Sequence, residues 1–239
     1  MNLQRFYDVS QAGDIESFER ELRTFAEHQG FPFFSAWLVL ESPEGASRPE
    51  IAVIRNTPNG FAELSGNTEH VRRDPVIHRL KRLSVPFVYD QALYVAEGAA
   101  DLWEAQAAHG YKYGINVALH LPGHRHFVLG VDREEALPTD EARLARLMAD
   151  LQLMAVHAQA AADRLLVPQG ADAQRPRLTA REMEILQWTR AGKSAWQTGV
   201  LLSISEATVN FHLRNLCQKL GVASKHQAVL RALALGLIH

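Results

Sequence analysis

The residues with the most definite chemistry in this chain lie near its C-terminus, in Ser205–Leu220 (SEATVNFHLRNLCQKL). At helical spacing its apolar side chains and one histidine share a face: Val209, His212, Leu213, Leu216 and Leu220. Asn210 and Arg214 lie one turn apart elsewhere, where asparagine can bind an adenine edge and arginine a guanine edge. An ordinary solvated face is the alternative, but the aromatic Phe211 on the polar side argues against it. The stretch therefore predicts a helix that reads DNA bases.

Phosphate contacts are expected around the same helix. Ser205 and Thr208 at its start can bind phosphate through hydroxyls and backbone amides, aided by the helix dipole. Three lysines are expected to add contacts that do not depend on DNA sequence: Lys193, Lys219 and Lys225.

The distribution of charge supports a polyanionic partner for this part of the chain. From Arg175 onward the chain has nine of its 25 basic residues but three of its 27 acidic residues, a net charge of +6. The first 174 residues carry −8, so that the whole 239-residue chain has a net charge of −2. A basic module behind an acidic one indicates that the basic module binds nucleic acid. A chance surface bias is the alternative.

Four short helices must position these side chains. Capping residues mark where the helices begin: Thr179 with Glu182, Ser194, Ser205, and Ser224 with Gln227. Glycines mark where three of them end: Gly192, Gly221 and Gly236. The two middle helices are joined by a tight turn at Ser203-Ile204, which predicts a helix-turn-helix. We therefore expect an all-α DNA-binding domain at 178–239, after a Pro/Gly/Gln-rich linker at 167–177.

The preceding residues 1–166 mix helical and strand patterns and are expected to form one α+β domain. Strands are predicted at 33–40, 51–55, 113–120 and 126–131, with a short edge strand at 86–89. Helices are predicted at 14–29, 76–83, 99–109 and 138–166. The last, with small alanines, could dock on its own sheet, form a dimer seam, or do both.

Several classes of protein are excluded by composition. One cysteine, Cys217, allows no internal disulfide. The sequence has no run of about 18 apolar residues, so no membrane span is expected. The first residues do not resemble a secretory signal. A cytoplasmic protein without a membrane partner is expected.

The C-terminal module resembles the DNA-binding domain of LuxR-type regulators. The resemblance rests on LTAREMEILQWTRAGKS (178–194), LSISEATVNFH (202–212) and KLGVASKHQAV (219–229). It implies that Asn210, Phe211 and Arg214 face the bases. The short scaffold helix departs from the family, with Trp196 and with Gln197-Thr198-Gly199 where Glu-Ile-Ala is common. These changes are expected to weaken the domain or shift the helix pair without abolishing DNA binding.

Residues 1–166 resemble the autoinducer-binding domain of the quorum-sensing branch of this family. The resemblance rests on cues in a fixed order: Gly30-Phe31, Thr57-Pro58, Asp74-Pro75, Trp103 before Gly110, and Tyr113-Gly114. It implies an α/β/α sandwich, with an antiparallel sheet between helix layers, that encloses an N-acyl homoserine lactone and forms a homodimer. No cofactor and no catalytic residue are implied.

The resemblance assigns the ligand pocket residue by residue. Asp74 keeps the acceptor for the ligand amide N–H, and Gly114 is the pocket glycine. Phe61 stands where the family has a Trp that donates to the lactone carbonyl, and Ser65 where it has a Tyr that donates to the acyl carbonyl. Tyr89 stands where the family has a second aromatic residue, usually Trp, in the wall of the pocket. Two polar anchors are therefore lost, and Trp103 is counted with the pocket residues.

Trp37 is our candidate to compensate for these losses. Counted from Gly30, it falls where relatives often carry a small pocket-facing glycine. The hypothesis is that its ring enters the pocket and supplies an N–H. The alternative is that Trp37 faces the helix layer as plain core.

Three rival functions remain open. The output half of a phosphorelay would need a receiver domain, but FFSAWLVLESPE shows only Glu41 of the acids required. An enzyme with a metal site could use His120, His124 and His126, although no cysteine or acid completes that set. A "solo" regulator of the same family would sense a non-lactone molecule or none. The expected partners are palindromic double-stranded DNA, a second copy of the chain and a small signal, with RNA polymerase as a further candidate.

Overall fold

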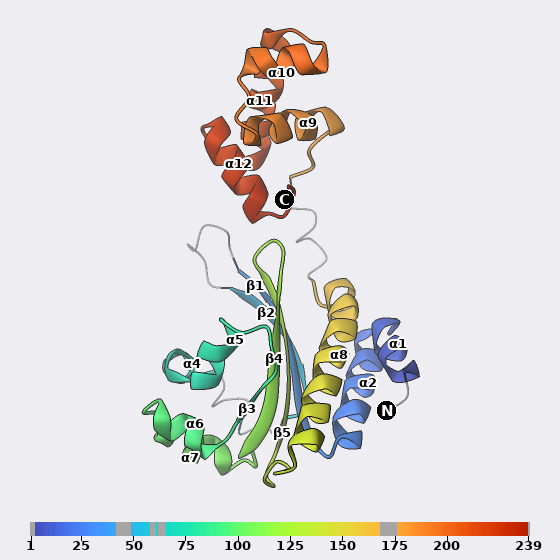
Figure 1. The fold of residues 1–239 in the computed structure, drawn as a ribbon, viewed down its shortest axis with the longest axis vertical. Helices are drawn as coiled ribbons and strands as arrows, with labels where there is room; N and C mark the ends of the chain where they lie inside the picture. The colour runs from blue at the N-terminus through green and yellow to red at the C-terminus, as the bar shows by residue number, and fades with distance from the viewer. Residues whose placement is uncertain (1–2, 42–48, 58–60, 62–65, 168–175, 239) are drawn as a thin grey trace. The chain divides into compact units, whose positions relative to one another are not determined.

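The computed structural model of the chain describes residues 3–41, 49–57, 61, 66–167 and 176–238. The chain forms two compact units that separate between Val167 and Pro168 (Figure 1). The predicted linker at 167–177 falls at this division, although its residues 168–175 lie outside the described residues. Among the helices of the described ranges, none is long and apolar enough to cross a membrane.

A five-stranded sheet forms the centre of the first unit, in the order β2-β1-β5-β4-β3 with every neighbouring pair antiparallel. The strands are β1 Phe33–Leu40, β2 Glu50–Arg55, β3 Phe87–Tyr89, β4 Tyr113–Leu121 and β5 Arg125–Arg133. The antiparallel sheet is thus confirmed, and β3 lies at the edge as its Pro86 suggested. Each strand alternates its side chains between the two faces of the sheet.

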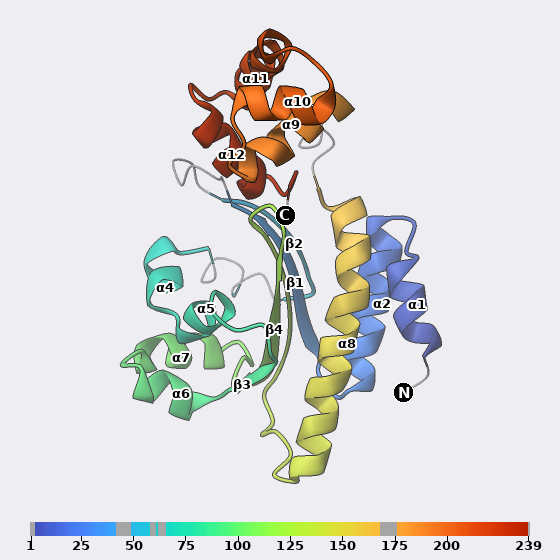
Figure 2. The same cartoon turned by 45° about the horizontal axis from the view of Figure 1, so that its top comes forward.

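The first face of the sheet packs against α2 Ile15–His28 and α8 Glu141–Leu165, and α1 Gln4–Ser10 packs on these two helices. All three helices are seen on one side of the sheet in Figures 1 and 2. Phe34, Ala36 and Leu38 of β1 are fully buried in this core. Small and apolar residues of α8 join them: Leu151, Met154, Ala155, Ala158 and Ala161. The helix α8 begins three residues later than predicted, because Asp140 caps it by accepting a hydrogen bond from the Arg143 N–H at 2.7 Å.

Among the described residues, the second face of the sheet carries the short helices α4 Thr68–Arg73, α5 Pro75–Leu80, α6 Gln91–Ala96 and α7 Ala100–Ala107 (Figure 2). A separate core fills this layer, with Tyr89, Tyr94, Leu102 and Ala118 among its buried members. The expected α/β/α sandwich is therefore confirmed. Sequence patterns gave no prediction of α1 or α6, which are short and lack a long apolar period.

The second unit contains four helices within residues 176–238: α9 Ala180–Arg190, α10 Ala195–Leu202, α11 Glu206–Leu220 and α12 Lys225–Ala234. Each begins at a predicted capping residue. The turn between α10 and α11 is tight, with Ser203 in the left-handed region at φ 53°. A Cβ at Gly199 would lie 2.8 Å from the Ile204 carbonyl oxygen. The glycine, a departure from the family pattern, thus accompanies a close approach of the turn to α10.

Candidate functional site

The recognition helix α11 is fixed at its start by two hydroxyls. Ser205 Oγ accepts a hydrogen bond from the Thr208 N–H at 3.1 Å and lies 2.8 Å from Thr208 Oγ1. Both side chains predicted to bind phosphate are therefore together at the first turn, where backbone N–H groups carry partial positive charge. The buried face of the helix is Val209, Leu213, Leu216 and Leu220.

The predicted base-reading side chains lie on the open side of α11. Arg214 is exposed and Asn210 half-buried. Phe211 is 52% exposed, and its ring meets that of His212 edge to face at a centroid distance of 5.6 Å. His212, expected in the core, is half-buried and pairs with Phe211. The arrangement presents one planar cation, one amide and one aromatic ring to a partner.

Two of the predicted phosphate-binding lysines lie close together. Lys193 and Lys225 are exposed and line one hollow between the end of α9 and the start of α12. Arg190 and His226 line the same hollow. Sequence reasoning did not single out these last two residues, although the charge count from Arg175 onward includes Arg190.

Lys219 has a different environment from the other two lysines. Its Nζ lies 2.7 Å from Oε2 of Glu182, which is only 3% exposed. Burial raises the pKa of Glu182, but hydrogen bonds from Lys219 and Thr179 outweigh it and leave the pKa below its ordinary value. Lys219 therefore stabilises the α9 capping box, and its contact with phosphate stays a prediction.

On the second face of the first unit, Asp74 is held by two donors. Its Oδ1 accepts the Val76 N–H at 2.8 Å, which caps α5, and the Tyr94 hydroxyl lies 3.1 Å away. Burial raises the pKa of Asp74, with these hydrogen bonds acting in the opposite direction. The predicted acceptor for a ligand amide is thus a partly buried acid in a fixed orientation.

An aromatic stack stands where the family has its donor Trp. The half-buried Phe61 ring lies flat on Tyr111, with centroids 3.8 Å apart, and Phe33 stacks on Tyr111 at 4.9 Å. Tyr111 was not predicted as a site residue. A tyrosine in the turn before β4 was the available signal. Ser65, predicted to line the same pocket, lies outside the described residues.

Tyr89 and Gly114 meet a residue that sequence reasoning missed. The Tyr89 hydroxyl donates to Oδ1 of Asp132 at 2.8 Å, and Asp132 pairs with Gly114 across β4 and β5. A Cβ at Gly114 would lie 2.3 Å from the Tyr89 ring and 2.5 Å from Asp132 Oδ1. The pocket glycine is therefore required by this contact. An aspartate within the apolar strand HFVLGVDR was the signal that could have identified Asp132.

The two candidate tryptophans, Trp37 and Trp103, differ in their surroundings and in their hydrogen bonds. Trp37 pairs with Val53 and Val128 and faces away from α2 and α8, so it lies on the second face of the sheet, half-buried. Val53 is 38% exposed, which leaves this end of the second face open to solvent. The Trp103 indole N–H instead donates to the Lys112 carbonyl at 3.2 Å and ties α7 to β4. Direct ligand contact by either residue stays a prediction.

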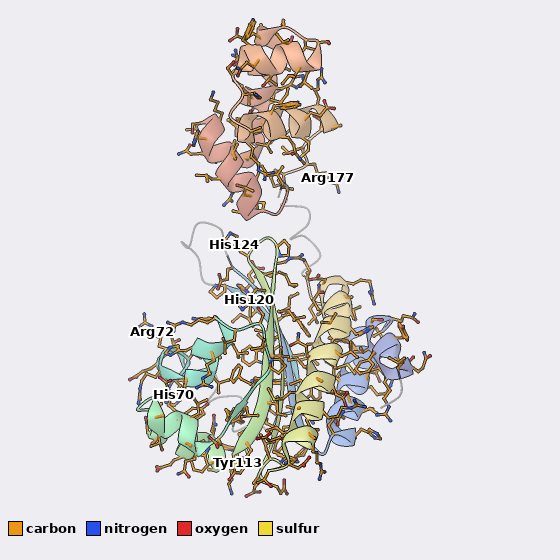
Figure 3. The ribbon with its side chains drawn as sticks, viewed as in Figure 1. His70, Arg72, Tyr113, His120, His124 and Arg177 are labelled. Carbon is orange, nitrogen blue, oxygen red and sulfur yellow. The ribbon has the colours of Figure 1, made fainter. Side chains whose placement is uncertain are left out.

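The histidine cluster forms a pair on the β4–β5 hairpin. His120 and His126 face each other across the hairpin with their Nδ1 atoms 2.8 Å apart, so one ring donates to the other. His124 lies in the turn itself at φ 56° (Figure 3). Within the described part of the chain, no group of three or more His, Cys, Asp or Glu side chains is arranged for a metal ion.

Known proteins resemble both units in the same order along the chain. A family model described as "Autoinducer binding domain" matches residues 14–162, and one described as "Bacterial regulatory proteins, luxR family" matches 176–232. The transcriptional activator protein SolR of Ralstonia nicotianae is 30% identical over 233 residues, covering 98% of this chain and 97% of SolR. The regulatory protein SdiA of Escherichia coli K12 is 29% identical over 241 residues, covering 99% and 95%. A structure of SdiA in complex with octanoyl-rac-glycerol superposes with a TM-score of 0.76 at 27% identity, covering 99% of this chain and 94% of that chain.

Proposed function

Since the chain belongs to the LuxR family of bacterial regulatory proteins, with an autoinducer-binding domain ahead of its DNA-binding domain, we propose that an acyl homoserine lactone controls its binding to DNA. The family consists of transcriptional regulators rather than enzymes, which argues against a metalloenzyme. An autoinducer-binding domain matches residues 14–162, where a phosphorelay output protein would need a receiver domain. Because its partner is DNA, the proposed regulator acts in the cytoplasm. We propose no cofactor besides this signal.

Asp74 carries the proposal. Its partly buried carboxyl group is oriented by the Val76 N–H and the Tyr94 hydroxyl. It stands at the position where the family accepts the amide N–H of the lactone. A hydrogen bond to a charged acceptor contributes about 1.5–3 kcal/mol, enough to make this one contact decisive for affinity.

The proposed mechanism couples ligand to DNA through a homodimer. The ligand covers the open end of the second face, around Trp37 and Val53. Leu153 and Val156 on α8 are 38% and 50% exposed, which supports a dimer contact along that helix. Two α11 helices then meet adjacent major-groove half-sites of a palindrome, about one turn or more apart. Contact with RNA polymerase would follow at the promoter.

A direct experiment identifies the signal. The full-length protein is purified from cells grown with and without a mixture of acyl homoserine lactones, and bound small molecules are identified by mass spectrometry. We expect a lactone to co-purify with the wild-type protein and to be lost from Asp74→Ala. A protein that binds no lactone, and whose affinity for operator DNA no lactone changes, would refute the proposal.

A second candidate is a regulator that senses a different acylated molecule. Phe61 has no donor for a lactone carbonyl, and the SdiA relative was solved with octanoyl-rac-glycerol. A monoacylglycerol has an ester and hydroxyl groups in place of the lactone ring. Recovery of an acylglycerol, or of no ligand, from protein that still binds its operator would favour this alternative.

A further inference from the structure

A buried carboxyl group lies on the second face of the sheet at Asp132, which is 6% exposed. The Tyr89 hydroxyl donates a hydrogen bond to its Oδ1 at 2.8 Å. Gly114, opposite on β4, leaves the space that both side chains need. Among the described residues, Tyr89 is the one hydrogen-bond partner of this carboxyl group, and no Lys or Arg pairs with it. No hydrogen bond to the second carboxyl oxygen is found among the described residues.

The charged and titratable groups around Asp132 come from several elements. Three tyrosine hydroxyls lie within its electrostatic reach: Tyr89, Tyr94 and Tyr111. Asp74 adds a second acid beside Tyr94, and the Arg55 guanidinium of β2 acts on Tyr111. Burial raises the pKa of Asp132 to about 7, and the Tyr89 hydrogen bond acts against this rise. Near neutral pH the carboxyl group therefore exists in both its ionised and its neutral form.

Three buried polar groups lie around the tyrosines that surround this acid. The Gln106 side chain is 8% exposed; its Oε1 lies 3.2 Å from the Tyr94 hydroxyl, and its Nε2 has no partner among the described residues. The hydroxyl of Tyr111, a residue 2% exposed, has the Thr57 hydroxyl beside it, and neither has another partner among the described residues. Buried polar groups in native proteins are nearly always paired. The Gln106 amide without a partner and the two hydroxyls that have only each other leave hydrogen-bonding capacity that polar atoms of a ligand can meet.

We propose that Asp132 acts in its neutral form, donating a hydrogen bond from its carboxyl O–H to a carbonyl oxygen of the acylated signal. A protonated carboxyl group has one O–H donor and can still accept from Tyr89 through Oδ1. It supplies the donor that Phe61 lacks, while Asp74 remains the acceptor for the amide N–H. This inference rests on the proposed function, since it requires a ligand with a carbonyl group.

The chemistry of the ligand sets the direction of the pH dependence. A ligand that covers Asp132 removes the remaining water, which favours the neutral acid. If only the neutral form binds, affinity falls about tenfold between pH 6 and pH 8, because the neutral fraction falls from about nine-tenths to about one-tenth around a pKa of about 7. A ligand with an ammonium group would show the opposite trend, because it needs the ionised carboxylate.

The test measures binding of N-hexanoyl, N-octanoyl and N-dodecanoyl homoserine lactone to the full-length protein by calorimetry at pH 6, 7 and 8, with the lactone ring checked intact. Three variants accompany the wild type. Asp132→Asn keeps the size of the side chain and offers an N–H donor at every pH. Asp132→Ala removes the donor. Asp101→Asn removes an exposed acid on α7 that pairs with Arg73 and serves as the matched control.

We expect the wild type and Asp101→Asn to bind about tenfold more weakly at pH 8 than at pH 6. Asp132→Asn should bind with equal affinity at all three values, and Asp132→Ala should bind weakly throughout. A wild-type affinity that does not change with pH, or that rises with pH, overturns the role of Asp132 while leaving the lactone receptor intact. If no variant binds any lactone at any pH, the proposed function fails and this inference fails with it.

Discussion

The ring of Tyr111 lies flat on the ring of Phe61, with 3.8 Å between their centroids and 7° between their planes. The family resemblance predicts that Phe61 stands where relatives have an indole donor, and on that prediction this stack places a hydroxyl-bearing ring beside the missing N–H. The Tyr111 hydroxyl is itself buried, with the Thr57 hydroxyl beside it. A hydroxyl donor therefore lies close to the ring of Phe61, which has no donor of its own.

Restoring the indole at this position should strengthen lactone binding. Phe61→Trp keeps an aromatic ring for the Tyr111 stack and adds an N–H that can meet the lactone carbonyl. One hydrogen bond contributes about 1–1.5 kcal/mol, so affinity should rise about tenfold. Calorimetric titration with N-octanoyl homoserine lactone measures the change, and Phe61→Leu, which has no donor, should show no gain. Equal affinity for Phe61→Trp and wild type would contradict the assignment of this position.

The hydroxyls of Tyr89 and Tyr111 should contribute unequally to stability. Tyr89 donates to the buried Asp132, so Tyr89→Phe leaves that acid without its partner and should lower the free energy of unfolding by about 1–3 kcal/mol. Tyr111→Phe removes a buried hydroxyl whose one neighbour among the described residues is the Thr57 hydroxyl, so it should change the stability of the ligand-free protein by less than about 1 kcal/mol. Urea unfolding of both variants tests the pair. The prediction fails if both changes destabilise the protein equally.

Asp132 should make the ligand-free protein less stable as the pH rises. Its folded pKa of about 7 lies above the ordinary value of 3.8, so the folded state retains a proton that the unfolded state has lost. Stability should therefore decline between about pH 4 and pH 7 and stay low above that, by at most about 4 kcal/mol. Asp132→Asn should remove this dependence and raise the melting temperature at pH 8. Scanning calorimetry from pH 5 to pH 8 measures both effects, and a slope unchanged in Asp132→Asn would assign it to other groups.

The contact between Lys219 and Glu182 should stabilise the DNA-binding unit. Lys219→Met keeps the aliphatic stem but leaves the 3%-exposed Glu182 without its cation, which should lower stability by about 1–3 kcal/mol. The pKa of Glu182 is depressed. The contribution is thus present above the ordinary value of 4.5 and lost as the pH falls through the lower, folded pKa. Urea unfolding at pH 7 and pH 4 checks this, with Lys225→Met as the exposed control. Equal stability of the two lysine variants would argue against a structural role.

The sequence predicted this fold well where local chemistry dictates structure. The four capping residues of the second unit and the alternation of FFSAWLVL each decide a backbone geometry within a few residues, so they could be read directly. The same alternation gives the face of Trp37 once the partner strands are known. The short helix α6 has six residues, too few for an apolar period, and was not predicted.

The ligand site could be predicted only in part, because its members are brought together by pairing of distant strands. Asp132 and Tyr89 are 43 residues apart in sequence and meet through the register of β3, β4 and β5. Gln106 reaches the same region from α7. Family resemblance predicted Asp74 and Gly114 as pocket residues, but Asp132 and Gln106 were not among the residues that it implied.

Substitutions at Arg214 and Lys193 should distinguish base-specific recognition from sequence-independent binding to DNA. Arg214 is exposed on the open side of α11, where it can bind a guanine edge with two hydrogen bonds. Arg214→Ala should relax base preference at one position of each half-site and cost about 1–3 kcal/mol for the preferred operator. Lys193→Ala removes a cation from the hollow shared with Lys225, so it should weaken all DNA sequences about equally. It should also reduce the dependence of affinity on salt by about one phosphate contact. Selection from a randomised operator library, combined with titrations at several salt concentrations, distinguishes the two. A specificity profile that Arg214→Ala leaves unchanged would show that other side chains of α11 read the bases.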